Sequence, residues 1–271
     1  MTVKAVCAML CISRQAFYRH RSAVEQAKLC DDVVIRLVQD IRRYQPRIGG
    51  KKLYHLLRND LPKLPVALGR DKFFQLLKNR KLLVKPTKKY TLTTQSHHWF
   101  RVHSNLLKTL TVTRANEAVV ADITYLRCEN KFCYLFLLTD VYSRKIVGYH
   151  LSQSLEVSGA ITAARMALTS MSSTKDLIHH SNRGVQYCCD DYGRLMNAHQ
   201  VRLSMGETGN PYDNAIAERV NGILKGEFLL DRTFASFPHA QRAVREAIET
   251  YNTRRPHLSL NYLTPEMKYA A

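Results

Sequence analysis

Three apolar runs, separated by connections of only a few residues, most strongly limit how this chain can fold. The runs cover Ala118–Leu126, Phe132–Asp140 and Arg144–Ser152. Connections this short join antiparallel neighbours, so we predict a meander of three strands. Further elements are predicted at helix Glu156–Ser170, strand Leu177–His180, helix Cys189–His199, strand Val201–Met205, helix Tyr212–Leu230 and helix Ser236–Arg254. This order predicts an α/β core over residues 118–235, followed by a C-terminal helix and tail over residues 236–271.

The charge of the chain is concentrated in its first two-fifths. The 271 residues carry a formal net charge of +19. Residues 1–110 contain 23 Lys and Arg against 6 Asp and Glu, whereas residues 111–271 contain 18 against 16. A basic segment attached to a nearly neutral one indicates a module that binds a polyanion, joined to a catalytic or structural domain. A basic surface that only keeps the protein soluble is the alternative, which the helical patterning of this segment disfavours.

The basic segment has the pattern of two helix-turn-helix units. In residues 1–24 a short amphipathic helix is followed by a turn and by a second helix, with Ser13 as N-cap. In residues 31–84 we predict helices at 31–44, 51–59 and 69–80. An ordinary helical hairpin is the alternative for the first unit. Polar and basic side chains on such helices contact DNA, and the candidates are Arg14, Gln15, Tyr18, Arg19, Arg70, Lys72 and Lys78.

Cysteine and histidine usage argues against a zinc or disulfide protein. The seven cysteines are scattered without a CxxC pair, which predicts reduced thiols. Residues 85–117 form a basic linker without periodicity, and its His97, His98 and His103 have no cysteines at zinc-finger spacing. No stretch approaches the roughly 18 apolar residues of a membrane span, and no signal peptide is recognisable. We therefore expect a cytoplasmic protein without a membrane partner.

Two acidic residues stand where metal-dependent phosphodiester chemistry would need them. Such chemistry uses two Mg²⁺ ions about 4 Å apart, bound mainly by carboxylates. Asp122 lies inside the strand-forming run VVADITYL, where an acid is costly to bury unless it is paired or metal-bound. Glu218 shares a face of the helix 212–230 with Asn221 and Lys225, which indicates a metal ligand with DNA contacts beside it. A solvated helix face is the simpler interpretation of this helix taken alone.

Five ordered blocks resemble the DDE transposase and retroviral-integrase superfamily, specifically the OrfB-type insertion-sequence transposases. The blocks are VADITYL, TDVYSRKIVGY, HHSNRGVQY, SMGETGNPYDNAIAERVNGILKGE and YNTRRPHLSLNYLTPEM, spread over residues 118–267. The basic segment of residues 41–83 resembles the helix-turn-helix region of this family. The resemblance implies an RNase H-like α/β catalytic core preceded by all-α helix-turn-helix units. In the last block, Tyr251, Arg255, Pro256 and His257 match the family's C-terminal motif, for which packing of the final helix is the simplest role.

The resemblance also implies the site and its partners. Asp122 and Glu218 match the first and third carboxylates, with 59 residues between Asp122 and Asn182 and 35 between Asn182 and Glu218. Lys225 matches a lysine that contacts element-end DNA, and Asn221 is a further candidate contact. The implied cofactor is a pair of Mg²⁺ ions, for which Mn²⁺ can substitute. The implied partners are double-stranded element ends and target DNA, bound by a homodimer or higher oligomer in the nucleoid of a bacterial cytoplasm.

Asn182 departs from the family, which has aspartate at this second catalytic and metal-binding position. An asparagine offers one carbonyl oxygen and no charge, so we predict weakened binding of at least one ion and little or no strand transfer. DNA binding should be retained, because it depends on Lys and Arg elsewhere. The leading hypothesis is a transposase that binds terminal inverted repeats and whose 3′-end cleavage and strand transfer are impaired.

Two other functions remain open from the sequence. One is a non-catalytic DNA-binding regulator with an RNase H-like body. The other is a structure-selective nuclease of the same fold, which would cut DNA without joining it. The paired helix-turn-helix units disfavour the nuclease, because they indicate recognition of a particular end sequence.

Overall fold

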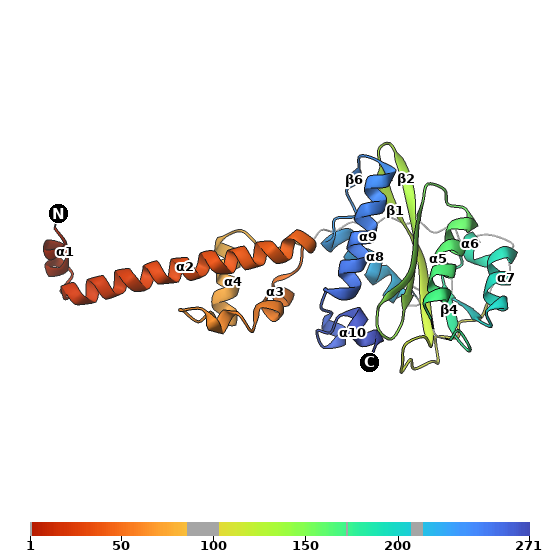
Figure 1. Ribbon diagram of the computed structural model, residues 1–271, viewed down its shortest axis with the longest axis horizontal. Coiled ribbons are helices and arrows are strands. Elements are labelled where there is room, and N and C mark those ends of the chain that lie inside the picture. The colour runs from red at the N-terminus through yellow and green to blue at the C-terminus, as the bar shows by residue number, and fades with distance from the viewer. Residues whose placement is uncertain (1, 86–102, 172, 207–213) are drawn as a thin grey trace. The chain divides into compact units, whose positions relative to one another are not determined.

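The chain forms two compact units, each with its own hydrophobic core (Figure 1). The computed structural model describes residues 2–85, 103–171, 173–206 and 214–271. The division between the units falls at residues 86 and 87, within the predicted basic linker. In the described residues, every helix is too short or too polar to cross a membrane.

The N-terminal unit is all-helical, as predicted. Its elements are α1 (Val3–Met9), α2 (Arg14–Tyr44), α3 (Gly50–Leu57), the 3₁₀ turn η1 (Leu61–Lys63) and α4 (Arg70–Asn79). Val34 and Val38 of α2 pack with Leu53 of α3 and with Phe73 and Leu77 of α4, and all five side chains are completely buried. This core joins the second half of α2 to α3 and α4.

One helix runs where the sequence pattern predicts two. Helix α2 is continuous over 31 residues, and Ser13 caps it by accepting a hydrogen bond from the backbone N–H of Ala16. Residues 23–30 contain no Gly or Pro and mostly good helix formers, so nothing in them ends the helix. The predicted gap between a unit ending at residue 24 and one starting at residue 31 is therefore helical.

The second unit is built on a mixed sheet. Its strands are β1 (Ala118–Cys128), β2 (Lys131–Asp140), β3 (Ile146–Ser152), β4 (Ile178–Ser181), β5 (Arg202–Met205) and β6 (Thr233–Phe234). The strand order is β3-β2-β1-β4-β5, with β6 paired to β1. Strands β1, β2 and β3 are antiparallel neighbours, which confirms the predicted meander, whereas β4 and β5 run parallel to β1.

Helices cover both faces of this sheet (Figure 1). Helices α5 (Val157–Ser170), α6 (Val185–Cys188) and α7 (Asp190–Ala198) share one core with Phe136 and Leu138 of β2. Helices α8 (Ala215–Glu227) and α9 (Phe237–Thr253) share the other core with Leu135 and Leu137. Successive residues of a strand point to opposite faces, so β2 supplies both cores and reads as an uninterrupted apolar run.

The segment after α9 belongs to the same unit. It contains the 3₁₀ turn η2 (Leu258–Leu260) and the short helix α10 (Pro265–Tyr269), which was not predicted. Lys145, at the turn between β2 and β3, forms a 2.9 Å ion pair with Glu266 of α10. Residues 236–271, predicted as a C-terminal helix and tail, therefore complete the α/β unit.

Candidate catalytic site

Adjacent parallel strands place Asp122 and Asn182 side by side. In the pairing of β1 with β4, Val120 lies opposite His180 and Ala121 lies opposite Ser181. The next residue on each strand is Asp122 on β1 and Asn182 just after the carboxyl end of β4. Their side chains meet there, with Nδ2 of Asn182 3.4 Å from Oδ1 of Asp122.

The orientation of the Asn182 amide is fixed by two partners. Its Oδ1 accepts a 3.1 Å hydrogen bond from the backbone N–H of Gly184, and its Nδ2 faces Asp122. A backbone N–H can only donate and an ionised carboxylate can only accept, so the reversed amide would lose both contacts. Asn182 therefore presents a hydrogen-bond donor to Asp122 and turns its only oxygen away.

Helix α8 brings two further polar side chains to Asp122. Asn221 donates a 2.6 Å hydrogen bond from Nδ2 to Oδ2 of Asp122. Glu218, one turn earlier on α8, is exposed, and its negative charge is close enough to raise the pKa of Asp122. The structure thus brings together all three predicted catalytic positions, 122, 182 and 218.

Burial dominates the electrostatics of Asp122. Removal from water raises the pKa of this carboxyl group to about 7, and the charge of Glu218 acts in the same direction. Hydrogen bonds from the backbone of Ile123 and from Asn221, together with the charge of Lys225, act to lower that pKa. A carboxyl group poised between its neutral and ionised forms near pH 7 is stabilised as the anion by any cation placed beside it.

The two α8 residues that we predicted to contact DNA are directed toward the site. Asn221 is only 8% exposed, and its amide is engaged by Asp122. Lys225 is half-buried, which lowers its pKa, while the charges of Asp122 and Asp231 raise it. Contact of these side chains with DNA stays a prediction. The sequence did not predict their interaction with Asp122, because the pattern of a helix face does not show which residue lies opposite it.

The sequence also did not predict a buried aromatic cluster formed by His179, Tyr187 and Tyr192, on either side of Asn182 in the sequence. The hydroxyl of Tyr192 lies 2.8 Å from Nε2 of His179, and the ring of Tyr187 lies 5.8 Å from that of His179 and 5.5 Å from that of Tyr192. All three side chains are buried, and burial lowers the pKa of His179 to about 3, so its imidazole is neutral. The positions 179, 187 and 192 follow no single helix or strand period, so only the density of aromatic residues could have suggested the cluster.

The donor set does not fit the pair of Mg²⁺ ions that the family resemblance implies. Hard divalent ions prefer carboxylate oxygens, and only Asp122 and Glu218 supply them here. Both oxygens of Asp122 already accept hydrogen bonds from amide groups, those of Asn182 and Asn221. Across the described residues, no three His, Cys, Asp or Glu side chains are grouped so that they could hold a metal.

The remaining candidate DNA contacts lie in the N-terminal unit and are exposed. Arg14, Gln15, Tyr18 and Arg19 occupy the first two turns of α2. On α4, Arg70 and Lys78 lie about 80° apart around the helix axis, whereas Lys72 projects about 200° from Arg70. A single DNA surface along α4 can therefore use Arg70 and Lys78 together, with Lys72 on another side.

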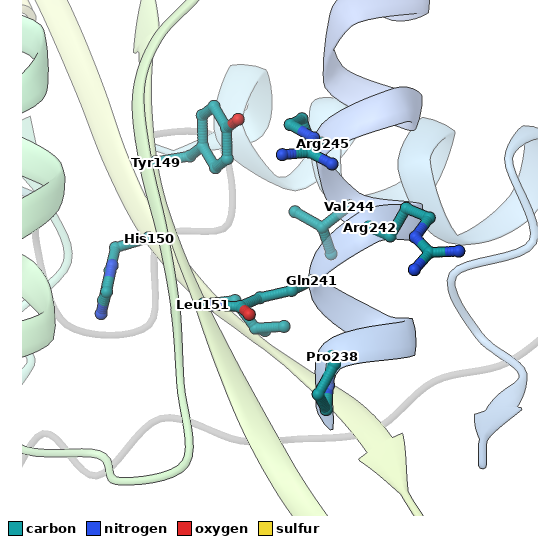
Figure 2. A pocket seen from close by; sticks show the side chains of 8 residues that line it. All are labelled: Tyr149, His150, Leu151, Pro238, Gln241, Arg242, Val244 and Arg245. Carbon is teal, nitrogen blue, oxygen red and sulfur yellow. The ribbon is translucent and has the colours of Figure 1, made fainter. Parts of the chain in front are cut away.

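A groove of about 370 Å³ lies between β3 and α9, apart from Asp122 (Figure 2). It is lined by Tyr149, His150, Leu151, Pro238, Gln241, Arg242, Val244 and Arg245. The sheet register places Tyr149 opposite Leu137 and Leu137 opposite Asp122, which puts the groove two strands away, about 10 Å. Its lining offers no carboxylate, so it does not extend the candidate catalytic site.

Comparison with known proteins identifies the family of this chain. Two family models, both described as integrase core domain, match residues 112–211 and residues 199–265. The chain is 32% identical to the insertion element IS600 uncharacterized 31 kDa protein of Shigella sonnei, over 96% of both chains. It is 30% identical to the transposase InsF for insertion sequence IS3A of Escherichia coli K12, over 98% of this chain and 93% of the relative.

A solved structure supports the fold. A chain of the simian T-cell lymphotropic virus intasome, determined in complex with PP2A regulatory subunit B56 gamma, superposes with a TM-score of 0.51 at 16% identity. The match covers 82% of this chain and 75% of the intasome chain. The full-length similarity to insertion-element proteins, the integrase core match and the α/β sheet agree with one another, and the chain belongs to the DDE transposases of insertion sequences.

Proposed function

We propose that this chain binds the terminal inverted repeats of its element and that Asn182 abolishes or strongly impairs Mg²⁺-dependent 3′-end cleavage and strand transfer. The proposal rests on one observation above the others. At the position of the second family carboxylate, an amide donates toward Asp122 and leaves no anionic oxygen facing the space between them.

The contrast with aspartate at this position explains the expected loss. An aspartate in the same place would keep the contact with Gly184 through one oxygen and turn its other oxygen toward Asp122. Two carboxylate oxygens about 3–4 Å apart repel each other unless a cation lies between them. With asparagine, the donor group of the amide takes the role of that cation, so the site is stable without a metal and poor at binding one.

The catalytic roles follow from this arrangement. Mg²⁺ or Mn²⁺ held at such a site would supply positive charge to the attacking and leaving oxygens. In this chain Asp122 on β1 and Glu218 on α8 would supply the charged ligands. Asn182 supplies no charged ligand. We infer that this missing charge limits catalysis and that DNA binding is retained.

DNA binding would depend on the N-terminal unit. Arg14, Arg19, Arg70 and Lys78 are exposed on α2 and α4. Basic side chains on helices of helix-turn-helix type contact phosphates and base edges. We further infer a homodimer or larger assembly on DNA, because two element ends must be held together, and action at the nucleoid of a bacterial cytoplasm.

The test restores the carboxylate. The Asn182→Asp variant is incubated with Mg²⁺ and labelled DNA that carries the ends of the chain's own element. We expect nicking at the 3′ ends followed by joined products, and a matched Asn182→Asp, Asp122→Asn double variant should yield neither. An Asn182→Asp variant that folds and binds the ends but neither nicks nor joins them would refute the site assignment.

The same experiment separates the two alternatives. The amide pairing around Asp122, which needs no metal, favours a non-catalytic DNA-binding regulator as the second candidate. A regulator would bind element ends with the same affinity whether residue 182 is Asn or Asp. It would neither nick nor join DNA in either form. A structure-selective nuclease would cleave without joining and would ignore the end sequence.

A further inference from the structure

The last sequence block connects the helix that carries Glu218 with the strand that carries Asp122. We name residues 251–269 the C-terminal brace. It starts at the end of α9 and finishes with α10, and its side chains contact α8, the edge strand β3 and the residues just before β1.

Near its start the brace contacts α8 through an ion pair between the buried Arg255 and the half-buried Glu227. Nε and Nη2 of Arg255 each donate a 2.8 Å hydrogen bond to a different oxygen of Glu227, the last residue of α8. Arg255 is 2% exposed. Glu227 follows Glu218 by nine residues, and an α-helix turns about 100° per residue, so the two project from roughly opposite sides. Arg255 therefore holds α8 from behind while Asn221 and Glu218 face Asp122.

At its first two residues, just before Arg255, the brace is attached to the open edge of the sheet. Asn252 accepts a 3.0 Å hydrogen bond from the backbone N–H of Ile146 and donates a 2.9 Å hydrogen bond to the carbonyl oxygen of the same residue. The hydroxyl of Tyr251 donates a 2.9 Å hydrogen bond to the carbonyl oxygen of Arg144. The Asn252 side chain thus bonds to the edge strand β3 as the backbone of a neighbouring strand would. These bonds fix the start of the brace relative to the sheet.

At its other end the brace holds the start of β1. The hydroxyl of Tyr269 donates a 2.7 Å hydrogen bond to Oδ1 of Asn116, two residues before β1 begins. The backbone N–H of Asn116 donates in turn to Oδ2 of the fully buried Asp140. Lys145 pairs with Glu266 and lies over the ring of Tyr269 at 4.2 Å, so one side chain contacts two residues of α10.

The Arg255–Glu227 pair is better explained by geometry than by stability. Burying two charges costs several kcal/mol, which their attraction often only offsets. Here Nη1 of Arg255 finds no hydrogen-bond partner in the described part of the chain, which adds to that cost. A forked arginine–carboxylate pair, in contrast, imposes a defined orientation on the elements it joins.

We propose that the C-terminal brace sets the separation of α8 and β1, and that Arg255 is a positioning residue for Glu218 and Asn221 opposite Asp122. This inference rests on the proposed function for its consequence in catalysis, but its geometric content can be measured without catalysis. In the described part of the chain, the hydrogen bonds of the Arg255 side chain go to Glu227, so Arg255 acts on Glu218 and Asn221 through Glu227.

The first test uses the chain with Asn182 unchanged. The side-chain amide of Asn221 reports the separation of α8 and β1, because it bonds Asp122 at 2.6 Å. In Arg255→Met we expect its ¹⁵N and ¹H signals to move toward those of exposed asparagines, and α8 backbone amides to exchange about tenfold faster while α5 is unchanged. The matched control is Arg242→Met, which removes an exposed guanidinium from α9 outside the brace and should change neither.

The outcomes decide the inference independently of the proposed function. Unchanged Asn221 signals, or equally accelerated exchange in α5 and α8, would overturn it. If Arg255→Met does not fold, Glu227→Gln keeps the shape, removes the charge and should give the same shifts at smaller size, and unchanged signals there would equally overturn it.

Catalysis gives a second readout in the Asn182→Asp background. There Arg255→Met should lower kcat about tenfold with KM for DNA within about twofold, and Arg255→Lys should restore part of the loss. If the single variant Asn182→Asp is inactive, the proposed function is refuted. The NMR signals of Asn221 would then decide by themselves whether the brace positions α8.

Discussion

Asn221 of α8 donates a 2.6 Å hydrogen bond to Asp122 of β1, which joins the two elements that carry the candidate carboxylates. This bond lowers the pKa of Asp122, whereas the nearby charge of Glu218 raises it. Two neighbouring positions on one helix therefore act on the same carboxyl group in opposite directions.

We expect Asn221→Leu and Glu218→Gln to shift the pKa of Asp122 in opposite senses from its value of about 7. Losing the amide donor removes stabilisation of the anion, so the pKa rises. Losing the negative charge of Glu218 removes repulsion, so the pKa falls. Titration of the Asp122 carboxyl carbon by ¹³C NMR measures both, and shifts of the same sign would contradict the geometry of this site.

The raised pKa of Asp122 also predicts how stability depends on pH. The ordinary pKa is 3.8 and the folded value is about 7, so the folded state binds the proton more tightly. The associated stability is complete below pH ~4 and is lost as the pH rises through ~7. Because Asp122 is partly exposed, we discount the full shift and expect a loss of about 1–3 kcal/mol.

Asp122→Asn should remove this pH dependence. We expect the free energy of unfolding of the unchanged chain to fall between pH 5 and 8 relative to this variant. Urea denaturation in EDTA measures the difference at each pH. Parallel curves for the two proteins would mean that Asp122 has the same pKa in the folded and unfolded states, which would contradict its burial between β4 and α8.

The first three strands could be predicted because apolar runs with short connections are a local signal. The runs around Asp122 and at residues 132–152 have short connections, and the observed pairing of β1, β2 and β3 follows from that. The place of Asn182 beside Asp122 follows from parallel pairing at the next register position. Sequence order and spatial order coincide for β1, β2 and β3 only, and the pairing of β4 with β1 is a long-range contact, so position 182 was implied by the family resemblance.

Other features depend on long-range contacts that no local pattern contains. Glu227 and Arg255 are separated by 28 residues and Asn116 and Tyr269 by 153, so neither pair could be found from spacing. Helix α10 has five residues, too few to show a helical period. The sequence pattern divides the single helix α2 because the apolar stripe weakens over residues 18–29, although helix propensity continues through them.

Metal dependence of stability should distinguish Asn182→Asp from the unchanged chain. Without metal, the new carboxylate faces Asp122, and we expect a loss of about 1–3 kcal/mol at pH 8 from repulsion of like charges. Mg²⁺ at about 100 times its Kd would return about 2.7 kcal/mol. The unchanged chain should gain little, because the Asn182 amide already occupies the facing position.

Thermal unfolding with EDTA and with Mg²⁺ measures this effect. The matched control is Asn197→Asp, which adds the same charge at an exposed position of α7. We expect its midpoint to be insensitive to Mg²⁺. Equal Mg²⁺ responses in both variants would show a general charge effect and would argue against a metal site between residues 122 and 182.

The basic residues of α4 should contribute to DNA affinity through phosphate contacts. Each contact released on substitution lowers the slope of log Kd against log salt by about 0.9, so Arg70→Ala with Lys78→Ala should reduce it by nearly 2. Lys131→Ala, at the exposed start of β2, removes a positive charge from the second unit and should leave the slope unchanged. Fluorescence anisotropy with element-end DNA across a salt series gives these slopes. Arg70 and Lys78 are both exposed and lie within about 80° of each other around α4, so one DNA surface could contact both. An unaltered slope for the double variant would show that the phosphate contacts are not made by this side of α4.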